Sequence, residues 1–139
     1  MLHTVADLMT PNPFSVKQDQ SLRDAHDLMR TKGIRHIPVV DHQGALCGML
    51  TQKVMVAEVM RILANFGPNA LERKEKHTAV TEIMATDFTP LSPEQSLSDV
   101  AQFFVDNRHG CMPVISRDNT LLGILTSSDF VRLAAALLF

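Results

Sequence analysis

The 139-residue chain carries a formal net charge of −2, and 45% of its residues are hydrophobic, enough for one compact core or two small halves sharing one. This charge balance lacks the basic excess that favours binding to nucleic acid or an anionic membrane. No apolar run approaches the roughly 20 residues of a membrane span, and the N-terminus lacks the basic and apolar regions of a signal peptide. We therefore expect a cytoplasmic protein with neither nucleic acid nor membrane as a partner. The cysteines, Cys47 and Cys111, are expected to be small buried hydrophobic residues rather than a disulfide.

The sequence contains an internal repeat with a constant offset of 75 residues and no gap over about fifty residues. Matching residues are mainly Ser, Pro, Gly, Thr and large aliphatics, the types that backbone and core constraints select. The clearest matches are VADLM (5–9) with VTEIM (80–84), QSLRDA (20–25) with QSLSDV (95–100), IPVV (37–40) with MPVI (112–115), and GMLT (48–51) with GILT (123–126).

Each repeat is predicted to begin with a short strand and a helix. The strands are Phe14–Val16 and Thr89–Leu91, which prolines or turn-forming residues flank. A serine then precedes an aspartate by three residues, a pattern that caps a helix and places an acid at its positive end. The two pairs are Ser21 with Asp24 and Ser96 with Asp99. Apolar residues at helical spacing follow in both copies.

Two apolar runs joined by a short polar turn come next and predict a β-hairpin in each copy. Gly44 and Asn119 occupy the turns and are residue types that tolerate positive φ. A last helix is predicted to start at Thr51 or Thr126. The predicted strands are 36–40 and 45–50 in the first copy, and 111–115 and 121–125 in the second.

Residues 65–79 interrupt the repeat. Gly67 and Pro68 are expected to stop the preceding helix, and the charged run LERKEKH is expected to form an exposed short helix or linker. The predicted fold class is therefore α+β, with tandem βαββα repeats at 1–64 and 80–139 and a linker at 65–79.

The repeats resemble the CBS-domain pair, also called a Bateman module. The resemblance rests on the aliphatic-Met start of each copy, the aliphatic-Pro-Val strand and the Gly-x-aliphatic-Thr close, and it covers roughly 5–60 and 80–137. It implies two units related by a pseudo-two-fold axis, frequent pairing into a homodimer, and regulatory binding of an adenosine ligand such as AMP, ADP, ATP or S-adenosylmethionine. It implies that the chain needs no catalytic cofactor and that an effector protein is a further partner.

The second Gly-x-aliphatic-Thr segment carries the candidate chemistry. A helix start attracts phosphate through its free N–H groups, and a carboxylate can accept hydrogen bonds from a ribose diol. In family terms Thr126 resembles the phosphate- or ribose-side hydroxyl and Asp129 the ribose-binding acid, with Ser128 in the same segment. Thr-x-x-Asp is also an ordinary capping pattern, and both roles can hold together.

The first copy departs from this pattern because Val54 stands where the second copy has Asp129. Valine cannot accept a hydrogen bond from ribose, and losing a bond to a charged acceptor costs roughly 1.5–3 kcal/mol. We therefore expect one competent nucleoside site. A plain core role for Val54 is the alternative.

The resemblance nominates two further groups of ligand residues. Basic residues before the Pro strand of the partner repeat often reach phosphates in this family, which nominates Arg35 and His36. Lys53, near the start of the first copy's last helix, is a third candidate, and a solvated or strand-end side chain is the alternative. The second-copy residue His109 is a weaker candidate near the base. The purine would lie against apolar and backbone groups that are otherwise ordinary core: Phe88, Thr89, Cys111, Met112, Pro113 and Ile124.

Catalysis is not expected, because the chain lacks HExxH, GxSxG, GxGxxG and any Cys/His cluster at zinc spacing. A metal site between His36 and His109 is a weak alternative, and we expect none. The main rival to a nucleotide sensor is a dimerisation or partner-docking scaffold whose cleft is vestigial.

Overall fold

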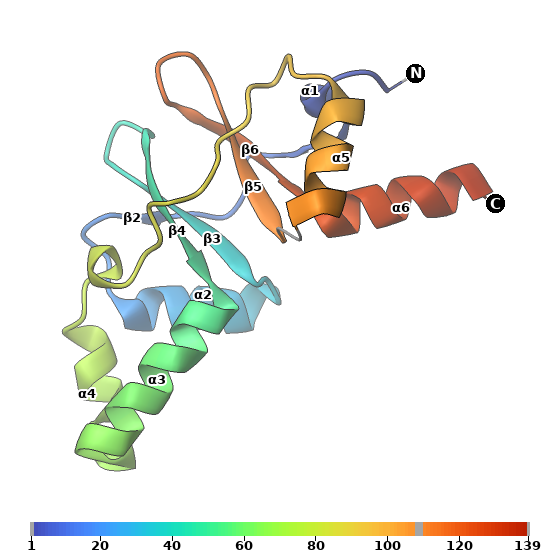
Figure 1. Cartoon of the computed structure of the whole chain (residues 1–139). Helices are drawn as coiled ribbons and strands as arrows, with labels where there is room; N and C mark the ends of the chain where they lie inside the picture. Colours follow the sequence, from blue (N-terminus) through green and yellow to red (C-terminus); the bar gives the residue numbers. More distant parts are fainter. Residues whose placement is uncertain (1, 108–109, 139) are drawn as a thin grey trace. The chain divides into compact units, whose positions relative to one another are not determined.

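The structure is a computed structural model that describes residues 2–107 and 110–138. The chain divides into two compact units (Figure 1). Unit 1 comprises Met1–Pro13 and Thr89–Phe139, and unit 2 comprises Phe14–Phe88. Each unit is described separately below. The predicted α+β class with two tandem repeats is confirmed by the order of helices and strands.

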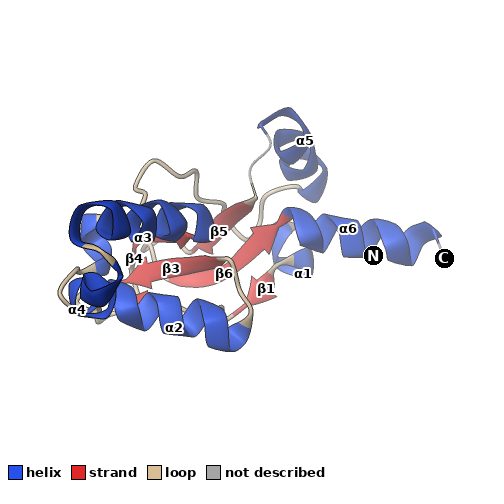
Figure 2. Cartoon of the chain, turned by 90° about the horizontal axis from the view of Figure 1, so that it is seen from below, coloured by secondary structure: helices blue, strands red, loops and turns tan. Residues whose placement is uncertain are grey.

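Unit 2 contains a three-stranded sheet in the order β2-β3-β4. Strand β2 (Val16–Lys17) pairs in parallel with β3 (His36–Val40), which forms an antiparallel hairpin with β4 (Leu46–Thr51). Helix α2 (Leu22–Lys32) and helix α3 (Gln52–Phe66) flank β3 in the view of Figure 2. The core between them contains Leu22, Ala25, Met29, Ile37, Leu50, Met55 and Ile62.

Local signals in the sequence explain these boundaries. The Ser21 hydroxyl accepts a hydrogen bond from the Asp24 backbone N–H at 3.2 Å, and Asp24 accepts one from the Ser21 N–H at 3.0 Å, which completes the predicted capping box. Helix α2 ends at Gly33, which adopts a left-handed conformation with φ of 64°. The predicted positive φ of the two hairpin residues is confirmed, at 88° for Gly44 and 68° for Asn119.

Unit 1 contains a second three-stranded sheet, in the order β1-β6-β5. Strands β5 (Cys111–Ile115) and β6 (Leu121–Thr126) form the predicted hairpin. The predicted first strand of this copy is reduced to a single parallel bridge between Leu91 and Val114. The helices are α1 (Val5–Leu8), α5 (Leu97–Asn107) and α6 (Ser127–Leu138). The core contains Val5, Leu91, Val100, Phe104, Met112, Val114 and Leu125.

The opening segments of the two repeats are exchanged, which the repeat alone did not predict. Strand β1 (Thr10–Pro11), from the first copy, pairs antiparallel with β6 of the second through Thr10 and Ile124. The equivalent residues of the opposite copies, Ala85 and Met49, form an antiparallel bridge in unit 2. The compact units therefore differ from the repeats predicted at 1–64 and 80–139.

Two glycines make room for the exchanged segments. An added Cβ on Gly123 would lie 2.7 Å from the Thr10 carbonyl oxygen and 2.8 Å from the Met9 sulfur. At the equivalent position, a Cβ on Gly48 would lie 2.5 Å from the Met84 sulfur. The Gly-x-aliphatic-Thr pattern therefore has a packing origin in both copies.

The prediction that residues 65–79 are exposed is wrong in part. The short helices η1 (Pro68–Ala70) and α4 (Leu71–Lys76) form there, and a further short helix, η2 (Val80–Glu82), opens the second copy. Ala70 is buried and Glu75 has no exposed surface. The Glu75 carboxylate lies 2.7 Å from His26 Nδ1 and 3.5 Å from Arg23, both on α2. The charged run therefore packs against α2 through the buried Glu75.

Cys47 and Cys111 are free thiols, and each is half-buried. None of the helices in the described part of the chain combines the length and apolar character needed to cross a membrane.

Candidate ligand site at the start of helix α6

The junction between β6 and α6 in unit 1 brings Thr126 and Asp129 together. Asp129 Oδ2 accepts hydrogen bonds from the Thr126 backbone N–H at 2.8 Å and from the Thr126 hydroxyl at 3.1 Å. The Asp129 N–H donates in return to the Thr126 hydroxyl oxygen at 3.3 Å. This reciprocal pattern is a capping box, so the capping role considered for the sequence Thr-x-x-Asp is realised.

The second oxygen of the same carboxylate has two further partners. Asp129 Oδ1 accepts a hydrogen bond from the Thr10 hydroxyl at 3.5 Å, and Arg132 approaches it from the next turn of α6. Asp129 is 2% exposed, whereas the Arg132 side chain is 68% exposed. The Asp129 carboxylate is therefore buried and hydrogen-bonded, whereas the Arg132 side chain that contacts it can move into solvent.

Thr10 and Arg132 were not predicted from the sequence. Arg132 lies three residues after Asp129 on a helix, a spacing at which side chains meet, and this signal could have identified it. No local signal identifies Thr10, because its position depends on the pairing of β1 with β6.

Cys111 lies opposite Thr126 in the β5–β6 ladder. Burial raises the pKa of the Cys111 thiol to about 12, and the negative charge of Asp129 contributes to the same increase. The thiol is therefore protonated at neutral pH and acts as a small apolar group at this site.

The remaining predicted residues of unit 1 differ in accessibility. Ser128 is exposed on the first turn of α6, and Thr89 is exposed. Ile124 is half-buried, between its ladder partners Pro113 and Thr10. The side chains of Met112 and Pro113 are buried, so only their backbone groups are available to a ligand, and the Pro113 carbonyl already accepts a hydrogen bond from the Leu91 N–H at 2.8 Å.

Four predicted residues belong to unit 2. Arg35 and Lys53 are exposed, and Phe88 is half-buried. Burial lowers the pKa of the half-buried His36, and the charge of Arg35 lowers it further. His109 lies outside the described residues. The described residues contain no group of three or more His, Cys, Asp or Glu side chains arranged to hold a metal ion.

The comparison with protein families decides the identity of the repeat. The family model described as CBS domain matches residues 5–61 and again residues 80–136, together most of the chain. The chain belongs to the CBS domain family. The resemblance inferred from the repeat is thereby confirmed.

Several relatives cover nearly the whole chain. The CBS domain-containing protein YhcV of Bacillus subtilis is 30% identical over 128 residues, which are 92% of this chain and 83% of that protein. The crystal structure of a putative acetoin utilization protein (AcuB) from Vibrio cholerae is 33% identical, has a TM-score of 0.81, and covers 99% of this chain and 94% of its own. The crystal structure of CBSX2 in complex with AMP is 26% identical, has a TM-score of 0.79, and covers 99% of this chain and 100% of its own.

Proposed function

We propose that this CBS-domain pair is a regulatory sensor that binds an adenosine-containing nucleotide at the Thr126–Asp129 junction and has no catalytic activity of its own. The observation that carries the proposal is a buried carboxylate held beside a hydroxyl at a strand-to-helix junction. This arrangement supplies an acceptor for a ribose diol and a helix start for phosphate. The crystal structure of the relative CBSX2 in complex with AMP supports an adenine nucleotide as the ligand.

Binding at Asp129 requires an exchange of hydrogen bonds. Both Asp129 oxygens already have protein partners, and the Oδ2 bonds hold the first turn of α6 together. The Oδ1 partners are easier to replace, because Arg132 is largely exposed and the Thr10 contact is long at 3.5 Å. A ribose diol would take the place of these two donors, and the released Arg132 guanidinium would be free to pair with a phosphate.

We expect a single nucleoside site in each chain. Thr51 caps α3 in the first copy by accepting a hydrogen bond from the Val54 N–H at 3.2 Å, as Thr126 does in the second copy. The first turn of α3, however, has no acidic residue. The acceptor that ribose needs is therefore absent from the equivalent position of unit 2.

The test is calorimetric titration of AMP into the wild type and Asp129→Ala. Loss of the charged acceptor is expected to weaken binding at least tenfold, from roughly 1.5–3 kcal/mol of lost hydrogen bonding. Asp24→Ala is the matched control, because Asp24 occupies the same capping position on α2 and its loss weakens a helix start elsewhere. Equal AMP affinity in the wild type and Asp129→Ala would remove Asp129 from the site.

A scaffold function is the second candidate, and one observation favours it. Exposed apolar side chains on the two long helices of unit 1 are Val105 on α5, and Val131, Leu137 and Leu138 on α6. Faces of this kind suit association with a second copy or with an effector protein. We propose a homodimer through these exposed apolar residues, tested by light scattering of the wild type and Val131→Lys. A monomeric wild type would refute it.

We also propose that the protein acts in the cytoplasm, in line with its two free thiols.

A further inference from the structure

Helix α6 carries one acid and one base, Asp129 and Arg132, and they contact each other. The Arg132 guanidinium approaches Asp129 Oδ1 from the next turn of the helix and makes no ion pair with any other described residue. The described part of unit 1 contains one other arginine or lysine, Arg117, in the turn between β5 and β6. That turn lies at the opposite end of the hairpin from Thr126. Arg132 is therefore the cation that the described residues of unit 1 place at the candidate site.

The Asp129–Arg132 pair differs from two other pairs at the same helical spacing. Arg30 pairs with Asp27 on α2 at 3.2 Å, and Arg61 pairs with Glu58 on α3 at 2.6 Å. The acid side chains of these two pairs are 45% and 14% exposed, whereas that of Asp129 is 3% exposed. Water competes for an exposed acid, but a buried carboxylate depends on donors from the protein. The Arg132 guanidinium therefore covers an acceptor that solvent hardly reaches.

The acid and the base of this pair are present together in the second copy and absent together from the first. At the offset of 75 residues, Asp129 and Arg132 correspond to Val54 and Ala57 on α3. Helix α3 nevertheless begins at the equivalent junction, where the Thr51 hydroxyl accepts a hydrogen bond from the Val54 N–H at 3.2 Å. The fold of the repeat therefore does not require the pair.

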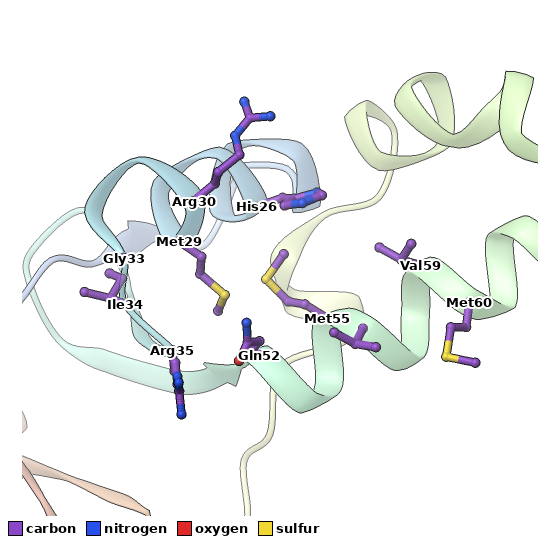
Figure 3. Close-up of a pocket in the computed structure, with 11 residues that line it drawn as sticks. His26, Met29, Arg30, Gly33, Ile34, Arg35, Gln52, Met55, Val59 and Met60 are labelled. Carbon is purple, nitrogen blue, oxygen red and sulfur yellow. The ribbon is translucent and has the colours of Figure 1, made fainter. Parts of the chain in front are cut away.

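The two copies also differ in where a cation stands at the helix start. Figure 3 shows Arg35 near Gln52, the first residue of α3, and the Arg35 carbonyl accepts a hydrogen bond from the Gln52 N–H at 2.9 Å. The equivalent bond in the second copy joins the Gly110 carbonyl and the Ser127 N–H at 3.3 Å. Because Gly110 has no side chain, the position that carries Arg35 in the first copy supplies no charge in the second. Arg132 on α6 supplies the cation there instead.

We propose that Arg132 is a specificity-determining residue through which the site selects a 5′-phosphorylated adenosine over free adenosine, an inference that rests on the proposed nucleotide site. In the empty site the guanidinium occupies Asp129 Oδ1, an oxygen that a ribose diol needs. A free nucleoside displaces the guanidinium and offers no replacement for the lost anionic partner. A nucleotide displaces it as well, but its phosphate is a new partner for the arginine. The pair therefore opposes binding of the nucleoside more than binding of the nucleotide.

The exposure of Arg132 permits this exchange of partners. Its side chain is 68% exposed and has several rotatable bonds, so the guanidinium can leave Oδ1 while the backbone stays in α6. Asp129 cannot move in the same way, because its Oδ2 holds the first turn of the helix through the Thr126 N–H at 2.8 Å. The arginine is thus the movable member of the pair and the carboxylate is the fixed one.

The test is calorimetric titration of adenosine and of AMP into the wild type and Arg132→Met, which removes the charge and keeps an unbranched side chain. Adenosine should bind Arg132→Met about threefold more tightly than the wild type, because no guanidinium has to be displaced. AMP should bind it about threefold more weakly, because the phosphate loses its partner. The preference for AMP over adenosine should therefore fall about tenfold. A purely structural role of Arg132 would weaken binding of both ligands alike.

Two further variants serve as controls. Arg132→Lys keeps the positive charge and should retain most of the preference for AMP, and Arg117→Met should leave both affinities unchanged. Equal changes for adenosine and AMP, or no change for either, would overturn the role of Arg132 and leave the nucleotide site in place. Absence of AMP binding to the wild type would instead refute the proposed function, and the role of Arg132 with it.

The displacement itself can be observed in ¹⁵N spectra of the arginine side chains. The Arg132 guanidinium of the ligand-free wild type should rotate more slowly than that of Asp129→Ala, because Asp129 Oδ1 holds it. Adenosine should release the guanidinium, and AMP should restrain it again. An Arg132 signal that saturating adenosine leaves unchanged would overturn the proposal.

Discussion

The Glu75 carboxylate lies 2.7 Å from His26 Nδ1, and this hydrogen bond fixes α4 against α2. Glu75 has no exposed surface, whereas 37% of the His26 side chain is exposed. The pair joins the segment between the repeats, which has no counterpart in the internal duplication, to the first repeat. Because Glu75 is buried and His26 is partly solvated, a substitution of Glu75 and a substitution of His26 should change the stability of the protein by different amounts.

Removal of His26 should cost more stability than neutralisation of Glu75. His26→Ala leaves a buried carboxylate with only the 3.5 Å contact to Arg23, so we expect a loss of about 3 kcal/mol. Glu75→Gln keeps the shape and leaves only partly exposed partners, so about 1 kcal/mol is expected. Urea unfolding measures both, with Glu72→Gln on the solvent side of α4 as the control. The reverse order would contradict a buried Glu75 side chain that depends on His26 for its hydrogen bond.

His36 should make the stability of the protein depend on pH. Burial and the charge of Arg35 lower its pKa below the ordinary value of 6.5, so the unfolded chain takes up the proton first as the pH falls. The contribution of neutral His36 to the free energy of unfolding is complete above pH 6.5. It is lost as the pH falls from 6.5 through the pKa of His36 in the folded protein. The melting temperature of the wild type should therefore fall more between pH 7.5 and 5.5 than that of His36→Gln. His77→Gln, at an exposed position, should follow the wild type.

The two cysteines should differ in reactivity. Burial, together with the charge of Asp129, raises the pKa of Cys111 to about 12, so very little thiolate exists at pH 8. We expect iodoacetamide to modify Cys47 several-fold faster than Cys111 in the folded protein. Peptide mass spectrometry over time measures both rates, and unfolding in urea should remove the difference. Faster modification of Cys111 would contradict its placement beside Asp129.

Arg35 provides a direct test of the phosphate role predicted from the sequence. If its guanidinium reaches a phosphate, Arg35→Ala should weaken AMP binding more than adenosine binding, because only AMP carries the charged group. Calorimetric titration of both ligands measures the two losses, with Lys17→Ala as an exposed basic control outside the predicted residues. Equal losses for the two ligands would contradict a phosphate role for Arg35.

The two glycines beneath the exchanged segments should not tolerate alanine equally. In Gly123→Ala the new methyl group would meet the Thr10 carbonyl oxygen at 2.7 Å, and a backbone atom in a strand cannot move away cheaply. In Gly48→Ala the nearest atom belongs to the flexible Met84 side chain, and the nearest backbone atom is 3.0 Å away. We expect a cost of about 2–3 kcal/mol for the first change and less for the second, measured by urea unfolding. Equal costs would argue against close packing of β1 on β6.

The helices and hairpins were predictable because local chemistry determines them. Ser21 and Asp24 form the expected cap, and Gly44 and Asn119 have the expected backbone angles. The exchange of opening segments was not predictable, because both pairings bury the same residue types. Met9 packs on Gly123 and Met84 packs on Gly48 in the exchanged arrangement. Without the exchange, each glycine would still be covered by a methionine, so the residue types do not distinguish the two arrangements. The burial of Glu75 was not predicted because nothing in a charged run marks the member that is buried against α2.

Within the candidate site, only the contacts between residues that are close in sequence could be predicted. Thr126 and Asp129 lie three residues apart across a helix start, and their interaction follows from that spacing. The remaining partner from a distant segment, Thr10, comes from a strand pairing that no motif specifies.

The exchange of opening segments has a consequence for how the chain can be divided. A protease cut between Lys76 and Val80 would leave an N-terminal fragment holding the strand that completes the β5–β6 hairpin, and a C-terminal fragment holding the residues that pair with β4. The C-terminal fragment would lack β1 of its three-stranded sheet, and the N-terminal fragment would lack the bridge from Met49 to Ala85. Each fragment would contain the segment that the other lacks. The two fragments are thus linked by the exchanged opening segments as well as by the peptide backbone. Fragments that are expressed separately should recover their structure only when they are mixed.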